Sequence, residues 1–128
     1  MAKKKYKKGE HILHEGTFGK EIYVIVKGKV KVYKTIANER VELATLGQDD
    51  FFGEMSLFLN LPRTASIEAI EDTEIVISNL DEFTSIIRED PELATQIIKT
   101  MAKRLHEAHN VIVKQEGEKK SLKIMYGI

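Results

Sequence analysis

The chain has 128 residues and a composition typical of a globular domain, and its 20 basic and 20 acidic residues give a formal net charge of zero. This balance argues against nucleic acid as a direct partner, because a nucleic-acid-binding face is usually strongly basic. The absence of cysteine excludes disulfides, and no apolar run reaches the roughly 20 residues of a membrane helix, so we expect no membrane contact and a cytoplasmic location.

The N-terminal segment, residues 1–8, is rich in lysine. A run of like charges is usually solvated and disordered. We therefore predict a basic tail followed by a β-domain over residues 9–78.

Two histidines and a glutamate, His11, His14 and Glu15, raise the question of a metal site, since metal-binding jelly rolls place such residues in early strands. Residues three apart in a strand point to opposite faces, so His11 and His14 are not expected to converge on one ion. The favoured interpretation is a strand over 10–14 that ends in a turn at Glu15 and Gly16, with no metal cofactor.

The clearest β signal lies between residues 21 and 37. A run of β-branched and aromatic residues over 22–26 precedes Gly28, and strict alternation follows over 30–33. Two such runs around a glycine predict a hairpin with Val30 and Val32 facing the interior. With a further strand over 41–46, the spacing of short strands and turns predicts a mainly β fold of the sandwich or jelly-roll type.

Residues 51–69 carry the strongest functional signal. Gly53 can adopt backbone angles that other residues avoid, and the apolar segment 55–59 reads as a single helical turn. The free amides of a helix start attract anions, above all phosphate, and Arg63 offers a planar fork for phosphate oxygens. Glu54 would repel an anion, so we expect it to accept a hydrogen bond from a hydroxyl group. An anion site beside a hydroxyl acceptor describes a ribose phosphate.

The alternation after Pro62 places Arg63 on the same strand face as Ala65, Ile67 and Ala69, so Arg63 is predicted to point inward. An inward cation needs a partner. The residue pattern leaves two candidates open, a carboxylate of the chain (Glu54, Asp49 or Asp50) and the phosphate of a ligand.

A strand over 73–78 and two helices complete the chain. Asn79 and Glu82 have the spacing of a capping box, with an apolar stripe of Leu80, Phe83, Ile86 and Ile87 behind it. Asp90 and Pro91 then predict the start of a long helix over 91–115. Apolar positions of this helix alternate steps of four and three, as in a coiled coil: Ala94, Ile98, Met101, Leu105, Ala108 and Ile112. The stripe can pack on the chain's own strands, on a second copy, or on both.

His106 and His109 could share one face of this helix, but no further ligand lies nearby, so no metal site is predicted there. Residues 117–128 form a charged tail with a short apolar tip, too short for a helix-turn-helix. No kinase motif and no channel segment is present, so we expect neither a catalytic nor a DNA-binding domain in this chain.

The stretch over 51–66 resembles the phosphate-binding cassette of the cyclic nucleotide-binding domain, the family of the bacterial catabolite activator, cyclic-nucleotide-dependent kinases and gated channels. The match comprises Phe52-Gly53-Glu54-Met55-Ser56-Leu57 and Pro62-Arg63-Thr64-Ala65, and the wider resemblance runs from about Tyr6 to Val113. It implies a jelly roll (double-stranded β-helix), a short cassette helix, and C-terminal helices over 79–116 that include a lid and dimerisation helix.

The resemblance also implies roles for single residues. The backbone N–H groups of Ser56, Thr64 and Ala65, with Arg63, would hold the cyclic phosphate, while Glu54 and Gly53 would take the ribose hydroxyl. The residues implied for the base pocket are Val32, Leu43, Arg104, Ala108 and His109.

The ligand implied is cAMP or cGMP. In the catabolite activator a Thr-Ser pair reads adenine, and Ala108 and His109 stand at those positions here, which puts that route to adenine selectivity in doubt. Thr64 can reach a guanine amino group, yet cAMP-responsive channels share the same Arg-Thr-Ala-Ser string, and cAMP is favoured.

The predicted function is therefore a cyclic nucleotide sensor that acts through its C-terminal helix, as a homodimer, on an unknown effector. Two alternatives stay open. One is a jelly-roll scaffold that dimerises through the helix without binding a nucleotide, and the other is a metal-dependent, cupin-like enzyme.

Overall fold

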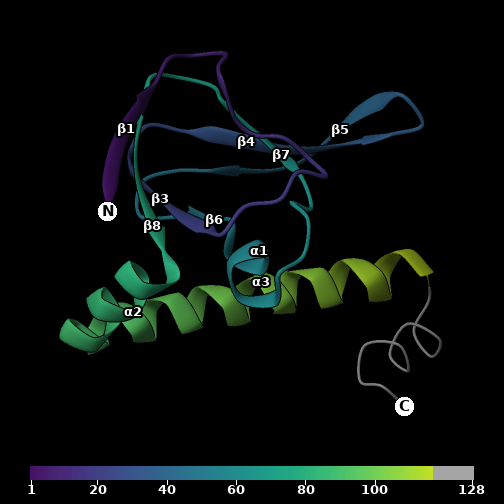
Figure 1. Ribbon diagram of the computed structural model, residues 1–128. Helices are drawn as coiled ribbons and strands as arrows, with labels where there is room; N and C mark the ends of the chain where they lie inside the picture. Colours follow the sequence, from purple (N-terminus) through teal and green to yellow (C-terminus); the bar gives the residue numbers. More distant parts are fainter. Residues whose placement is uncertain (117–128) are drawn as a thin grey trace. The chain divides into compact units, whose positions relative to one another are not determined.

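The computed structural model describes residues 1–116, and the side chains of residues 1–110. The chain divides into two compact units, Met1–Ile86 and Ile87–Ile128, and each is considered by itself. Within the described residues, the first holds all the strands, a short helix and most of a second helix, and the second holds one long helix (Figure 1). The charged tail predicted for 117–128 lies outside the described residues.

Eight strands form two four-stranded antiparallel sheets in the first unit (Figure 1). One sheet has the order β1-β8-β3-β6, with β1 Ala2–Tyr6, β8 Thr73–Asn79, β3 Glu21–Lys27 and β6 Phe51–Phe52. The other has the order β2-β7-β4-β5, with β2 His11–Leu13, β7 Ser66–Ala69, β4 Val30–Ile36 and β5 Glu39–Leu46. This is the predicted jelly roll.

One core joins the two sheets, because buried residues from seven strands form a single apolar cluster. Alternation explains which residues enter it: within β3 and β8, every second side chain faces the interior. The cluster consists of Tyr6, Leu13, Tyr23, Ile25, Val30, Phe52, Ile67, Ala69 and Ile75.

The predicted tail is wrong for most of residues 1–8, because β1 pairs along its whole length with β8, from Ala2 opposite Ile77 to Tyr6 opposite Thr73. The lysines of β1 are exposed, and Lys3 and Lys5 lie near the Glu74 carboxylate. The strand occupies a sheet edge, where lysine is a common protection against unwanted pairing. The β-domain therefore begins at residue 2, not at residue 9.

The predicted hairpin across Gly28 is also wrong. β3 pairs with β6 and β8, whereas β4 pairs with β5 and β7, so the chain crosses from one sheet to the other at this glycine. Gly28 has a φ of +102°, and a Cβ there would lie 2.4 Å from the Thr73 hydroxyl. The glycine is thus needed for a crossing between sheets, where sequence spacing had suggested a tight turn within one sheet. The interior positions of Val30 and, in part, Val32 are confirmed.

The helices begin where their capping residues predict. In α2 (Leu80–Glu89), the Asn79 side chain accepts a hydrogen bond from the Glu82 amide at 2.8 Å, and the Glu82 carboxylate accepts one from the Asn79 amide at 3.1 Å. Of the predicted α2 stripe, Phe83 is buried but Leu80 is 46 % exposed. In α3 (Pro91–Glu116), the Asp90 carboxylate accepts a hydrogen bond from the Leu93 amide at 3.1 Å.

The long helix keeps much of its apolar surface exposed. Ile98 and Leu105, both in the predicted coiled-coil stripe, are 65 % and 63 % exposed, while Ile97 beside them is buried. Ile112, the last position of the stripe, lies beyond the side chains that are described. No helix in the described part of the chain is apolar enough over a sufficient length to cross a bilayer.

Candidate functional site

The predicted cassette is a short helix between two turns. Gly53 precedes α1 (Glu54–Leu59) with a φ of +88°, a left-handed conformation that favours glycine, and Asn60 ends the helix in a similar conformation. The Ser56 hydroxyl donates to the Leu61 carbonyl at 2.7 Å, which joins the helix to the segment that returns toward Arg63. The single helical turn predicted from the sequence is confirmed.

Arg63 points inward, as predicted, and is 5 % exposed. It does so ahead of β7, which begins only at Ser66, so the strand alternation that suggested this orientation does not cause it. The backbone fixes the residue instead. Its amide donates to the Thr17 carbonyl at 2.7 Å, and its carbonyl accepts from the Gly16 amide at 2.8 Å.

The guanidinium group of Arg63 is held by backbone carbonyls. Nη1 donates to the Gly53 carbonyl at 3.1 Å and to the Glu21 carbonyl at 3.3 Å. Among the side chains of residues 1–110 no salt bridge involves Arg63, so the carboxylate partner that the sequence left open is not present there. Carbonyl dipoles compensate a buried cation only in part, and the site is suited to a negatively charged ligand.

Two glycines leave room for this guanidinium. A Cβ at Gly19 would lie 2.3 Å from Nη2 of Arg63, and a Cβ at Gly53 would lie 2.8 Å from Nη1. Any side chain at either position would therefore displace the guanidinium from its present position. Sequence reasoning identified Gly53 but missed Gly19, whose only signal was a second glycine three residues after Gly16.

An aromatic pair adjoins the same group. The Tyr23 and Phe52 rings are parallel with centroids 5.1 Å apart, and the guanidinium carbon of Arg63 lies 5.4 Å from the Tyr23 centroid. Burial raises the pKa of the Tyr23 phenol above its usual value, and the Glu21 carboxylate adds to that rise, while the Arg63 cation opposes it. Sequence reasoning treated Tyr23 only as a strand residue, because its proximity to Arg63 depends on β3 and the cassette coming together.

The other predicted phosphate and ribose residues are distributed around α1. Ser56 and Ala65 are buried, Glu54 is half-buried, Met55 is 43 % exposed, and the Thr64 side chain is exposed. The structure therefore brings Gly53 and Arg63 into direct contact. It leaves the Thr64 side chain accessible from outside.

The residues predicted for the base pocket fall in both units. Val32 is partly buried against the core on β4, and Leu43 is 52 % exposed on β5. On α3, Arg104 and His109 are half-buried and Ala108 is exposed. A pocket that combines the two groups stays a prediction.

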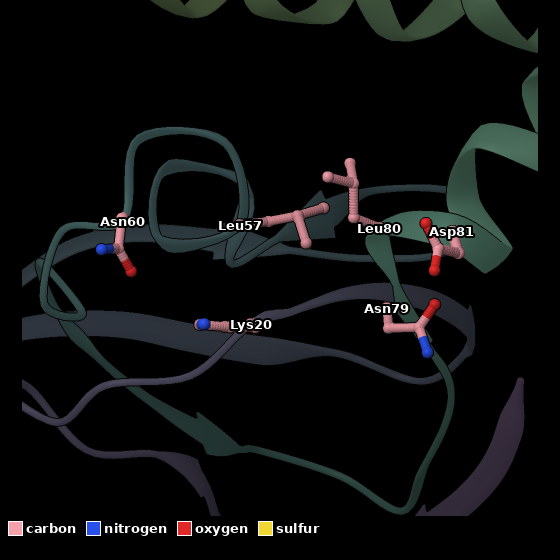
Figure 2. Close-up of a pocket in the computed structure, with 6 residues that line it drawn as sticks. All are labelled: Lys20, Leu57, Asn60, Asn79, Leu80 and Asp81. Atoms are coloured by element: carbon pink, nitrogen blue, oxygen red, sulfur yellow. The ribbon is translucent and has the colours of Figure 1, made fainter.

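A groove of about 410 Å³ lies beside α1 on the first unit (Figure 2). Leu57 and Leu80 lie in its middle, with Lys20 and Asn60 toward one end and Asn79 and Asp81 toward the other. It contains none of the residues predicted to hold phosphate, ribose or base, so it is not the predicted ligand site.

The histidines near the N-terminus behave differently from the prediction. The His11 and His14 rings stack with centroids 5.1 Å apart, because β2 ends at Leu13 and its register shifts between His11 and Leu13. The two rings therefore lie side by side, whereas the strand argument placed them on opposite faces. Among the residues that the structure describes, no group of three or more metal-ligating side chains could hold an ion.

His11 belongs instead to a polar cluster on the outer face of the second sheet. The Glu68 carboxylate lies 3.1 Å from Lys31, 3.4 Å from His11 and 3.6 Å from Arg40. The hydrogen bond from Lys31 lowers the pKa of Glu68 below its usual value, and the charges of Lys31, Arg40 and His11 lower it further against the effect of burial.

Comparison with known proteins identifies the family of this chain. Residues 3–90 match the model of the cyclic nucleotide-binding domain family. The chain is 36 % identical over 104 residues to the cyclic AMP receptor protein of Thermus thermophilus, which covers 80 % of this chain and 48 % of that protein. It is 40 % identical over 91 residues to a cGMP-dependent protein kinase of Plasmodium berghei, covering 70 % of this chain and 10 % of the kinase.

A solved structure gives the same result. The crystal structure of the Thermus thermophilus catabolite activator protein superimposes with a TM-score of 0.74 at 34 % identity, over 84 % of this chain and 51 % of that one. The chain thus spans about half the length of the bacterial relative it matches. It belongs to the cyclic nucleotide-binding domain family.

Proposed function

We propose that the chain is a regulatory module that binds a cyclic nucleotide through its cassette, and that cAMP is preferred to cGMP. The observation that carries this proposal is Arg63, a buried cation whose Nη1 donates to two neutral carbonyls. A cyclic phosphate would supply the negative charge that the described part of the chain does not place in a salt bridge with it.

The remaining ligand contacts follow the family pattern. The backbone amides of Ser56, Thr64 and Ala65 would join Arg63 on the phosphate, and Glu54 with Gly53 would take the ribose hydroxyl. Val32 and Leu43 would contact the base from the strands, and Arg104, Ala108 and His109 would do so from α3.

The preference for cAMP rests on two supports. The match covers 48 % of the Thermus thermophilus relative, which is named a cyclic AMP receptor protein, but only 10 % of the kinase relative, which is named for cGMP. The Arg63-Thr64-Ala65-Ser66 string is shared with cAMP-responsive channels. A single base contact changes affinity by about 1–3 kcal/mol, so both nucleotides are expected to bind, cAMP the more tightly.

The signal would pass through α3. A ligand shifts a conformational equilibrium only by the difference in its affinity for the two states, so α3 must contact bound nucleotide in one placement more than in another. Hydrogen exchange along α3, measured with and without cAMP, tests this step: slower exchange between Ile97 and Leu105 on binding supports it, and unchanged exchange contradicts it.

Calorimetry tests the binding itself. We expect heat on titration with cAMP, a weaker response with cGMP, and loss of more than about 100-fold in affinity in Arg63→Leu, because a charge-assisted contact is removed. Arg40→Leu is the matched control, since Arg40 also lies over a tyrosine ring but outside the cassette. Melting temperatures of both variants report whether the fold is kept.

Two results would overturn the proposal. Unchanged cAMP affinity in Arg63→Leu would remove the assigned phosphate site. No heat with either nucleotide would favour a domain that keeps the fold but works as a scaffold through its long helix.

A further inference from the structure

The immediate surroundings of Arg63 divide its guanidinium into two parts. Nη1 is engaged by the carbonyls of Glu21 and Gly53. The other edge, formed by Nε and Nη2, lies against Gly19, where a Cβ would be 3.2 Å and 2.3 Å from these two atoms. Among the described side chains, the hydrogen bonds of the guanidinium use Nη1 alone, so the N–H donors of Nε and Nη2 can serve a ligand.

The guanidinium is a rigid plane with its N–H donors in a fixed fork, and both carbonyl bonds use Nη1. Hydrogen bonds tolerate some departure from ideal geometry, so the whole plane can still tilt about Nη1, and Nε and Nη2 move with it. A second type of contact is needed to hold the remaining edge in one orientation.

Tyr23 offers that contact. Its ring centroid lies 5.4 Å from the guanidinium carbon, within the range of a cation–π interaction, and the Tyr23 side chain is 7 % exposed. The ring is itself held by its parallel stack on Phe52, at 5.1 Å and an interplanar angle of 4°. A desolvated cation–π contact is among the stronger ones of its kind.

We propose that Tyr23 is a positioning residue for the nucleotide site: the face of its ring holds the Arg63 guanidinium in the orientation in which its Nε and Nη2 edge receives the cyclic phosphate. The inference rests on the proposed function and assigns the ring, not the hydroxyl group, as the part that acts. The aromatic column of Phe52 and Tyr23 thereby links the apolar core to the charged group of the cassette.

The chain provides a close internal control. Tyr33 is also 7 % exposed and also lies under an arginine, with the Arg40 guanidinium carbon 3.9 Å from its ring centroid. Arg40 and Tyr33 belong to the outer face of the second sheet, where Tyr33 is hydrogen-bonded to His11 at 2.6 Å. Replacing either tyrosine removes a buried aromatic ring and an arginine contact, but only Tyr23 adjoins Arg63.

The first test compares cAMP dissociation constants in the whole chain. Tyr23→Phe keeps the ring face and should bind within about twofold of the unmodified chain. Tyr23→Leu should weaken binding about 5- to 30-fold, the range expected for loss of a cation–π contact. Tyr33→Leu should bind within about twofold. Equal affinity of Tyr23→Leu and the unmodified chain would overturn the proposal.

Loss of packing in Tyr23→Leu could mimic this result, and a second series separates the two effects. Phenylalanine with one, two and three ring fluorines at position 23 keeps the shape of the ring while it reduces the negative charge of its face. Affinity should fall stepwise with fluorination. A flat series would overturn the proposal in favour of a purely structural role.

A third measurement needs no nucleotide, so it distinguishes failure of this inference from failure of the proposed function. The Nε–H resonance of Arg63 in the unliganded chain should shift in Tyr23→Leu and stay in place in Tyr33→Leu. If cAMP does not bind but the resonance shifts, the proposed function is wrong and the positioning contact stands. If cAMP binds and the resonance does not shift, the positioning contact is wrong.

Discussion

Nη1 of Arg63 lies 3.1 Å from the carbonyl oxygen of Gly53, so the two ends of the cassette meet at a hydrogen bond between a charged side chain and a left-handed glycine turn. The same carbonyl accepts the first helical hydrogen bond of α1, from the Leu57 amide at 3.2 Å. The conformation of Gly53 therefore determines both where the helix begins and where the cation sits.

Gly53→Ala should reduce both stability and nucleotide affinity. A Cβ there would meet Arg63 Nη1 at 2.8 Å and the Glu21 carbonyl at 2.9 Å, in a residue with a φ of +88°. The left-handed backbone alone costs about 1–3 kcal/mol of unfolding free energy. Urea unfolding and calorimetry with cAMP measure the two effects.

Gly9→Ala is the control that separates the effect of the steric clash with Arg63 from the effect of backbone strain. Gly9 has a φ of +92°, close to that of Gly53, but a Cβ there meets nothing within 4 Å. The Gly9→Ala chain should lose a similar amount of unfolding free energy through backbone strain and keep its cAMP affinity. If both variants lost affinity equally, the close approach between Gly53 and Arg63 would not matter for binding.

We predict a homodimer through α3, and Leu105→Glu or Ile98→Glu should convert it into monomers. These two side chains are 63 % and 65 % exposed on α3, and burying each would contribute about 1.5–3 kcal/mol per copy. In a twofold-symmetric interface each change counts twice, so the dimer dissociation constant should rise at least about 100-fold. Sedimentation velocity at several concentrations measures it. Lys103→Glu, on an exposed position of the same helix, is the control and should leave the dimer intact. An unmodified chain that sediments as a monomer at all concentrations would contradict the prediction.

Asn79→Ala should lower the unfolding free energy by about 1 kcal/mol. The change removes the side chain that accepts a hydrogen bond from the Glu82 amide at 2.8 Å, and so leaves the first turn of α2 without that cap. Asn79→Asp should restore most of the loss, because a carboxylate accepts the same bond. Urea unfolding of the three chains is the measurement, and an alanine variant as stable as the unmodified chain would show that the cap contributes nothing.

Lowering the pH should reduce the unfolding free energy of the chain, because Glu68 becomes protonated. Its pKa in the folded state lies below its ordinary value of 4.5, first because Lys31 donates to it and then because Arg40 and His11 are near. Its ionised form therefore stabilises the fold above about pH 4.5, and that contribution is lost as the pH falls through the lowered value.

Glu68→Gln should accordingly be less stable than the unmodified chain at pH 7, and the difference should shrink between pH 5 and about pH 3. Glu39→Gln, on an exposed position of β5, is the matched control and should follow the unmodified chain throughout. Parallel stability curves for Glu68→Gln and the unmodified chain would refute the assignment.

Local sequence signals were sufficient wherever the structure depends on neighbours in the chain. The capping residues Asn79 and Asp90 mark the starts of both C-terminal helices, because a cap acts within three residues. Gly53 and the apolar turn after it predicted α1, and the β-branched runs predicted most of the strands. The inward orientation of Arg63 was also expected, although for the wrong reason.

Pairing between distant segments could not be read in this way. The lysines of residues 3–5 suggest a tail. The segment is nevertheless a strand, because its backbone pairs with β8, some seventy residues later, while its lysine side chains stay exposed to water. For the same reason the glycine at position 28 joins two sheets, since a strand's composition does not state which strand it pairs with.

The sequence by itself determined the family, the cassette and the cation that defines it. Only the tertiary structure decided what holds that cation: the carbonyls of Glu21 and Gly53, the space left at Gly19 and the ring of Tyr23. These groups come from segments between ten and more than forty residues away from Arg63. Every residue has a backbone carbonyl, so the sequence does not indicate which carbonyl will accept a hydrogen bond from a distant side chain. Their convergence exists only once β3, β6 and the return segment have folded together.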